Sequence, residues 1–145
     1  MYLYHATNRK NLESILEKGL LINPPEHNWN DMYCENQIFL AFDASVAEEY
    51  AKTSENAPSE VVVLKVKLDS LNSNFRYDWN NRCEYTKDIN SCVYKSDISP
   101  ECLQICNPAN EPSQTIHDFE GTDLYEIILT VFDEEVETNL EREDY

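Results

Sequence analysis

The sequence is poor in glycine and in positive charge. Only two glycines occur among its 145 residues, so a glycine-rich loop of the kind that cradles phosphate groups is excluded. Lysine and arginine number 11 against 28 aspartates and glutamates, which gives a formal net charge of −17. A surface this negative repels phosphate backbones and anionic lipids. We therefore do not expect a membrane or a nucleic acid as partner, whereas small molecules and basic proteins remain open.

Long apolar runs and cysteine pairs are also missing. No stretch approaches the about 18 consecutive apolar residues of a membrane span, and the N-terminus does not have the pattern of a signal peptide. The five cysteines include no CxxC pair, and the spacing of Cys102 and Cys106 is a weak metal signal without a nearby histidine. We expect free thiols, a cytoplasmic location and no metal.

The sequence does contain enough apolar residues for one core. Hydrophobic residues make up 41% and aromatic residues 11% of a chain whose length fits a single domain. The last 13 residues contain seven acids against one arginine. We assign residues 1–132 to one domain and residues 133–145 to an acidic, solvated tail.

The first twenty residues predict a strand and a helix. Residues 2–5 alternate as a strand does, which places His5 at the end of that strand. Thr7 or Asn8 can cap the helix that follows, and Gly19 is expected to end it. The residues expected on its buried stripe are Leu12, Ile15 and Leu16.

Further elements follow from the same kinds of pattern. Asp43 can cap a short helix whose buried face holds Val46, Ala47, Tyr50 and Ala51. Strands are expected within residues 37–42, 60–68 and 91–105, and one short strand within residues 69–90. The apolar segment 123–132 is expected to be a strand rather than a helix, because it is rich in β-branched and aromatic residues.

Two segments, LYHATNRKNLESILEKGLLINPPE and QIFLAFDASVAEEY, resemble the catalytic core of the ADP-ribosyltransferases, in the branch that contains the poly(ADP-ribose) polymerases and the diphtheria-type toxins. The resemblance covers about the first 50 residues without a gap. Beyond residue 70 it is only architectural. The matching positions are His5-Ala6-Thr7, Gly19-Leu20, Pro24-Pro25, and the strand and helix of IFLAFDASVAEEY, which ends at Tyr50.

The resemblance implies an α+β fold, a split β-sandwich of two antiparallel sheets with short flanking helices, and NAD bound as substrate between the sheets. In such a site, His5 would hydrogen-bond the adenosine ribose. The backbone of Ala6 would hold the nicotinamide amide, and Thr7 would contact the nicotinamide ribose. Tyr50 would stack on the nicotinamide ring, where an aromatic face contributes about 1 kcal/mol beyond burial.

Each of these residues also has a structural interpretation. A histidine at a strand end can be a satisfied structural residue, Tyr50 can be core packing, and Thr7 can be a helix cap. Tyr33 and Trp29, in the loop that follows the first helix, could cover the ligand or pack on the sheet. The spacing from His5 to Tyr50 matches that of the family, and this favours the NAD site over the structural interpretations.

The chain departs from the family pattern at three places. Phe39 replaces a tyrosine, and Ala47 replaces a serine that commonly helps to hold the nicotinamide amide, which removes a contact of about 1 kcal/mol. The third motif usually begins a late strand with a glutamate, and the matching segment here opens with Asn90, Ser91 and Cys92. The other candidates for this carboxylate are Glu84 and Glu126, which precedes an apolar run.

The sequence therefore favours an NAD-dependent mono-ADP-ribosyltransferase that acts as a monomer. We expect it to modify a macromolecular acceptor, and the charge favours a basic protein. Poly-chain synthesis is not expected without the glutamate. Two alternatives remain: a catalytically degenerate module that binds NAD or ADP-ribose, and an acidic protein that occupies a basic partner surface. The small acidic chain would also suit a toxin or effector delivered into a host cytoplasm.

Overall fold

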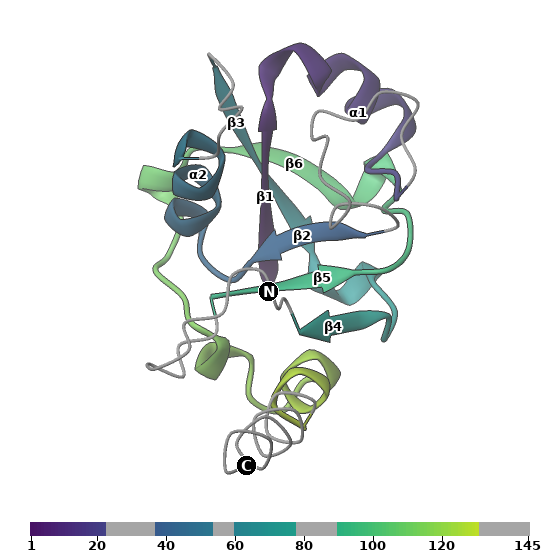
Figure 1. Ribbon diagram of the computed structural model, residues 1–145, viewed down its shortest axis with the longest axis vertical. Helices are drawn as coiled ribbons and strands as arrows, with labels where there is room; N and C mark the ends of the chain where they lie inside the picture. The colour runs from purple at the N-terminus through teal and green to yellow at the C-terminus, as the bar shows by residue number, and fades with distance from the viewer. Residues whose placement is uncertain (23–36, 54–59, 78–89, 131–145) are drawn as a thin grey trace, which may run out of the picture.

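The structure, a computed structural model, describes residues 1–22, 37–53, 60–77 and 90–130. Within these residues, six antiparallel strands form a sheet in the order β4-β5-β2-β1-β3-β6 (Figure 1). The strands are β1 (Tyr2–Asn8), β2 (Ile38–Ala41), β3 (Val61–Lys67), β4 (Phe75–Tyr77), β5 (Ser91–Tyr94) and β6 (Leu103–Cys106). The helices are α1 (Leu12–Lys18), α2 (Ala44–Thr53) and a segment at 123–130. Short 3-10 turns are η1 (Arg9–Asn11), η3 (Leu68–Ser70), η5 (Pro100–Cys102), η6 (Pro108–Asn110) and η7 (Ile116–Phe119).

The sheet consists of two halves that meet between β1 and β2. β1 pairs with β3 along its whole length, from Tyr2↔Lys67 to Asn8↔Val61. By contrast, the register of β1 with β2 consists of the single pair Tyr4↔Ala41. The α+β class and the antiparallel strands expected from the sequence are confirmed, and the two expected sheets are the halves of one six-stranded sheet joined at this pair.

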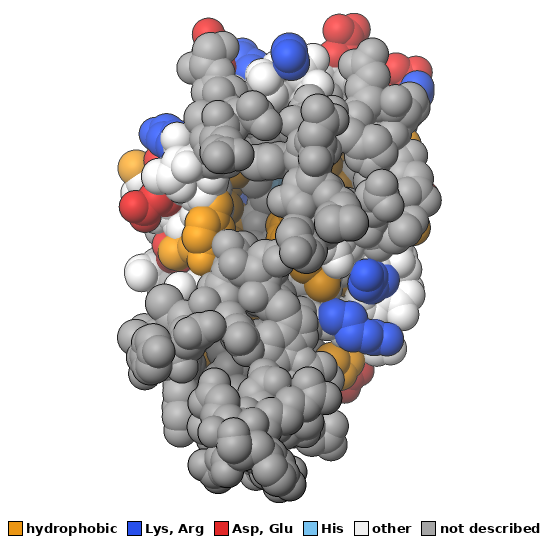
Figure 2. Space-filling model, viewed as in Figure 1, with side chains coloured by type: hydrophobic (Ala, Val, Ile, Leu, Met, Phe, Trp, Pro, Cys, Tyr) orange, Lys and Arg blue, Asp and Glu red, His pale blue; other side chains and the backbone are white. Residues whose placement is uncertain are grey.

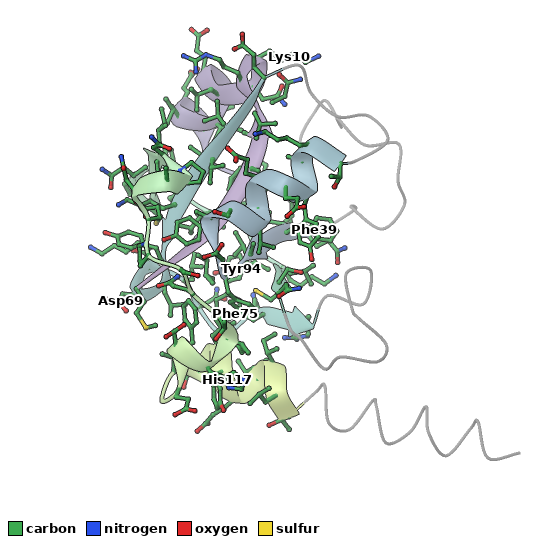
Figure 3. All side chains as sticks on the ribbon, turned by 90° about the vertical axis from the view of Figure 1, so that its left-hand side faces the viewer. Lys10, Phe39, Asp69, Phe75, Tyr94 and His117 are labelled. Atoms are coloured by element: carbon green, nitrogen blue, oxygen red, sulfur yellow. The ribbon has the colours of Figure 1, made fainter. Side chains whose placement is uncertain are left out.

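Two clusters of buried residues cover the two faces of the sheet. Successive side chains of a strand point to opposite faces, so Leu3 belongs to the larger cluster and Tyr4 to the smaller one. The larger cluster includes the rings of Phe75 and Tyr94, whose centroids are 5.1 Å apart. Figure 3 shows these two rings on the side of the C-terminal helical segment, with Phe39 nearer to α2. The smaller cluster, under α2, consists of Tyr4, Ala41, Ala44, Ala47 and Val63.

The N-terminal helix begins and ends largely as the sequence predicts. Asn8 caps the 3-10 turn η1, because its side chain accepts a hydrogen bond from the backbone N–H of Lys10 at 3.2 Å. Gly19 ends α1 with a φ of 86°, and a Cβ at this position would collide with the carbonyl oxygen of Ile98. The predicted buried stripe is wrong at Leu16, which is 44% exposed, because α1 lies over the sheet only through partly buried residues such as Ile15.

The prediction of a strand at 123–132 is wrong, because residues 123–130 are helical. Leu124 and Ile128, one helical turn apart, are both buried in the larger cluster, and this packing overrides the β propensity of the segment. Thr122 helps to begin the helix, since its hydroxyl accepts from the backbone N–H of Tyr125 at 3.3 Å. Within the described ranges, no helix is long and apolar enough to cross a membrane.

Candidate functional site

The direction of the backbone groups along β1 follows from hydrogen bonds at both of its ends. The N–H of Leu68 donates to the carbonyl of Met1 at 3.0 Å, and the N–H of Arg9 donates to the carbonyl of Glu60 at 3.1 Å. In an antiparallel ladder, alternate residues direct both backbone groups to the same neighbour. The odd residues of β1 therefore bond to β3, and the even residues, including Ala6, direct their N–H and C=O toward β2.

The pairing of β1 with β2 stops before it reaches Ala6. If the register Tyr4↔Ala41 continued, Ala6 would lie opposite Phe39, but the two strands do not pair at that position. The donor and acceptor of Ala6 thus lie on a stretch of strand edge without a ladder partner among the described residues. We call this stretch, from His5 to Asn8 on the side of β2, the unpaired edge of β1.

The ring of His5 connects the unpaired edge to β2. Its Nδ1 lies 2.8 Å from the backbone oxygen of Phe39. A carbonyl oxygen can only accept, so Nδ1 must carry the proton, and Nε2 of the neutral ring is left as an acceptor. Burial lowers the pKa of His5 below its ordinary value of 6.5, and the hydrogen bond to Phe39 opposes this shift. At neutral pH His5 is therefore an uncharged hydrogen-bond acceptor at Nε2.

Helix α2 lies beside β1 on the face of the sheet that holds Tyr4 and the smaller cluster (Figure 1). Asp43 begins it, since its Oδ2 accepts from the backbone N–H of Ser45 at 3.2 Å. Ala44, Ala47 and Ala51 are buried, and these small side chains let the helix approach β1 and β3 closely. Tyr50 is partly buried one turn after Ala47 on the same stripe, which places its ring at the margin of the packed face.

Phe39 lies on the face of β2 that holds Ala41, and Ala41 packs in the cluster under α2. The ring of Phe39 is partly buried, and Figure 3 shows Phe39 close to α2. Three elements that contact one another carry most of the predicted site residues. These are His5, Ala6 and Thr7 from β1, Phe39 from β2, and Ala47 and Tyr50 from α2.

Asn90 is the residue that the resemblance assigns to the third motif. It directly precedes β5, its side chain is exposed, and its carbonyl accepts from the N–H of Phe42 at 3.1 Å. The register Ala41↔Ser91 places it across β2 from β1. Glu126 is instead an exposed residue of the C-terminal helix, so the strand start for which it was a candidate does not exist. Glu84, Tyr33 and Trp29 lie outside the described residues.

One positive side chain lies on the row of the sheet that holds Phe39, and a second lies just beyond the end of β5. Phe39 is opposite Val93 of β5, and Val93 is opposite Arg76 of β4. Lys95, which follows β5, donates from Nζ to the side-chain oxygen of Gln37 at 3.3 Å. Figure 2 shows blue side chains gathered where Figure 1 draws β4 and β5. In the described part of the chain, no carboxylate forms an ion pair with Arg76 or Lys95. An anionic ligand is therefore less repelled here than the net charge suggests.

Two residues that support the junction were not recognised from the sequence. The hydroxyl of Tyr4 donates to Glu111 Oε1 at 3.0 Å, and Lys65 Nζ lies 3.7 Å from the same oxygen. Burial, with the hydrogen bond to Glu111, raises the pKa of Tyr4. Gln114 donates to two backbone carbonyls of the junction. Glu111 and Gln114 both belong to the loop CNPANEPSQ. Their partners Tyr4 and Tyr2 are more than 100 residues away in sequence, so no local pattern could have indicated these contacts.

The remaining chemistry of the described residues is limited. Burial, with the nearby charge of Glu111, raises the pKa of the Cys106 thiol to about 11, so this cysteine is a poor nucleophile at neutral pH. No group of three or more potential metal ligands occurs in the portions of the chain that the structure describes. What the site offers is a backbone donor and acceptor, a neutral histidine and aromatic faces.

A comparison with protein families gives one match of nearly full length. The model of the poly(ADP-ribose) polymerase catalytic domain matches residues 1–135. The matched region includes the unpaired edge of β1, α2 and Asn90. A search of curated proteins found no match.

Proposed function

Because the chain belongs to the poly(ADP-ribose) polymerase catalytic domain family, a family of NAD-dependent ADP-ribosyltransferases, we propose that it transfers a single ADP-ribose unit from NAD to a macromolecular acceptor. The acceptor we propose is a basic protein in the cytoplasm, in keeping with the net charge of −17. The observation that best supports the proposal is the unpaired edge of β1, with the neutral ring of His5 beside it.

The unpaired edge is complementary to the carboxamide of nicotinamide. A primary amide has one N–H₂ donor and one oxygen acceptor, and the N–H and C=O of Ala6 face the same side of the strand. The amide can therefore pair with Ala6 as a neighbouring strand would. The ring of Phe39 lies on the α2 side of this junction, and Tyr50 belongs to α2 itself. These two rings can supply aromatic faces for the nicotinamide ring.

The hydroxyls of the two riboses of NAD need hydrogen-bonding partners other than the backbone groups of Ala6, which pair with the nicotinamide amide. Nε2 of His5 is an acceptor in the tautomer set by Phe39, so it can accept from a hydroxyl of the adenosine ribose. Thr7 lies two residues further on the same face of β1, and its hydroxyl can contact the nicotinamide ribose. Both side chains are held by a strand that is fully paired with β3, which keeps them in fixed positions.

Transfer breaks the bond between the ribose C1′ and the nicotinamide nitrogen. The bond electrons go to the pyridinium ring, which leaves as neutral nicotinamide, and positive charge develops on the ribose as in glycoside hydrolysis. The acceptor nucleophile then attacks C1′ and loses its proton. No acid is needed for the leaving group, so catalysis rests on positioning and on electrostatic stabilisation of the cation. The resemblance assigns the third-motif position to Asn90, whose neutral amide would stabilise the cation less than a carboxylate, and this supports a slow, single transfer.

The proposal is tested with labelled NAD in a cell lysate, using the wild-type protein, His5→Ala, and His117→Ala as a control. His117 is an exposed histidine of η7, outside the site. We expect label transfer by the wild type and by His117→Ala, and a decrease of about 100-fold for His5→Ala. Transfer that does not depend on His5 would rule out the site.

A second function is favoured by the absence of a carboxylate at Asn90 and of a hydroxyl at Ala47. A protein that only binds NAD or ADP-ribose would show no label transfer, but would bind NAD in a titration, and His5→Ala would abolish this binding.

An acidic interaction protein would instead form a salt-sensitive complex with a basic partner that survives both His5→Ala and Tyr50→Ala.

A further inference from the structure

The β1–β2 junction is fastened by a side chain at the end opposite to the unpaired edge. Nε2 of Gln114 donates to the carbonyl of Tyr2 at 3.2 Å and to the carbonyl of Phe42 at 2.8 Å. Both partners can only accept, so both hydrogens of the amide are used and its orientation is fixed. The amide thus connects the two strands where their own ladder does not.

The order of these contacts along the junction is important. Tyr2 and Phe42 lie on one side of the pair Tyr4↔Ala41, and the contact between His5 and Phe39 lies on the other side. The strands are therefore held by Gln114 at one end, by one backbone pair in the middle, and by the His5 ring at the other end. With one backbone pair between the two ends, we expect a change at the Gln114 end to alter the separation of the strands at the His5 end.

The same residue also connects the junction to α2. The backbone N–H of Gln114 donates to Asp43 Oδ1 at 2.9 Å, and Asp43 Oδ2 caps the first turn of α2. Gln114 thus contacts the end of β1, the residue that follows β2, and the cap of the helix that holds Ala47 and Tyr50. Figure 1 shows the chain between β6 and the C-terminal helix passing along this side of the molecule.

We propose that Gln114 is a positioning residue of the NAD site, which sets the separation of the unpaired edge of β1 from Phe39 and from α2. This role rests on the proposed function. Gln114 does not need to touch NAD, because its three hydrogen bonds fix the three elements that do. An error of about 1 Å in such positions can decrease catalysis about 100-fold.

The loop that holds Gln114 has other attachments, so the residue can be changed without releasing the loop. Glu111 accepts from the Tyr4 hydroxyl on one face of the sheet. On the other face, Ile116 and Phe119 are buried, and the Phe119 ring lies 5.5 Å from that of Phe42. Gln114→Met keeps the length of the side chain and removes its amide, and with it both of the hydrogen bonds that the side chain donates.

The test compares Gln114→Met with two controls. Gln104→Met makes the same substitution at an exposed position of β6. Thr115→Ala removes the capping box of η7, one residue from Gln114, and therefore controls for destabilisation of the same segment. For each protein, kcat and KM for NAD are measured together with the ¹⁵N chemical shifts of the His5 ring, which report its tautomer.

For Gln114→Met we expect kcat/KM to fall by about tenfold, mainly through KM, and the His5 signals to shift away from the Nδ1–H tautomer. Both controls should match the wild type in KM and in the His5 signals. Gln114→Asn, which keeps the donors on a shorter side chain, should give intermediate values, and it replaces Gln114→Met if that variant does not fold.

Wild-type His5 signals and KM in Gln114→Met would overturn the proposal, and so would an equal loss in Thr115→Ala. The tautomer measurement separates this result from a failure of the proposed function. If the wild type does not bind NAD, the proposed function fails, and the His5 signals of Gln114→Met alone still decide whether Gln114 positions the junction.

Discussion

The two edges of β1 are used in opposite ways. Toward β3, β1 pairs from Tyr2 to Asn8 without interruption, and every odd residue bonds to its neighbour. Toward β2, it pairs at Tyr4 alone, and the next contact comes from the ring of His5 rather than from the backbone. The same seven residues thus provide a complete ladder on one side and an unpaired edge on the other.

This difference shows how a small chain can expose backbone groups without losing its fold. An unpaired stretch of strand costs stability unless its groups find other partners. Here the complete edge and the two buried clusters hold β1 in place, so that Ala6 can direct its donor and acceptor toward a ligand. The predictions below change each edge separately.

The largest effect is expected on the paired edge. Leu64 lies opposite His5 in β3 and is fully buried, so Leu64→Ala should lower the free energy of unfolding by about 2–5 kcal/mol. Ile105 lies opposite Leu64 on β6 and is 50% exposed, so Ile105→Ala should change it by only about 0.5 kcal/mol. Urea unfolding measures both, and equal losses would contradict the role given to the paired edge.

The next effect concerns Asn90, the residue that the resemblance places where the third motif usually has a carboxylate. Asn90→Glu would place a negative charge near the cationic transition state, and we expect turnover of NAD to rise about tenfold. Asn110→Glu, at an exposed position of η6, adds the same charge elsewhere and should not change turnover. A similar rate for Asn90→Glu and the wild type would show that Asn90 is not at the third-motif position.

The protonation of His5 gives a pH dependence to the junction. Its pKa is lowered in the folded state, so between this pKa and the ordinary value of 6.5 the unfolded chain binds a proton that the folded protein does not. The free energy of unfolding should therefore fall as the pH decreases through this window. His5→Gln should lack this component, because a glutamine amide binds no proton in this window. Parallel pH profiles of the two proteins would contradict a buried, neutral His5.

The smallest effect is expected from a hydroxyl added at Ala47, where the family commonly has a serine. Ala47→Ser would return a donor to the turn of α2 that faces the junction, and one hydrogen bond to the nicotinamide amide is worth about 1 kcal/mol. NAD binding should tighten by about fivefold in a titration. Ala44→Ser is the control, one turn earlier on the same buried face, and it should leave NAD affinity unchanged.

The sequence predicted well those features that depend on neighbouring residues. The alternation in VVVLKVK gave β3, and the spacing from His5 to Tyr50 indicated elements that the structure places side by side. The cap at Asn8 and the helix end at Gly19 also follow from local chemistry. The antiparallel α+β class came from the resemblance rather than from any one pattern.

Features that depend on distant contacts could not be predicted. The helix at 123–130 forms because Leu124 and Ile128 pack in the larger cluster, although the local propensity favours a strand. Leu16 repeats with helical spacing, yet α1 leaves it exposed. Gln114 lies in a polar loop, and its function becomes visible only when Tyr2 and Phe42 are placed beside it.

The central claim is that the unpaired edge of β1 binds the nicotinamide end of NAD. Backbone ¹H–¹⁵N NMR during titration with NAD, and with nicotinamide alone, tests it most directly. The N–H of Ala6, which faces β2, should show the largest shift along β1, while the N–H groups of His5 and Thr7, which bond to β3, should shift little. Shifts that spare Ala6, or that are as large at Leu3 as at Ala6, would contradict the claim.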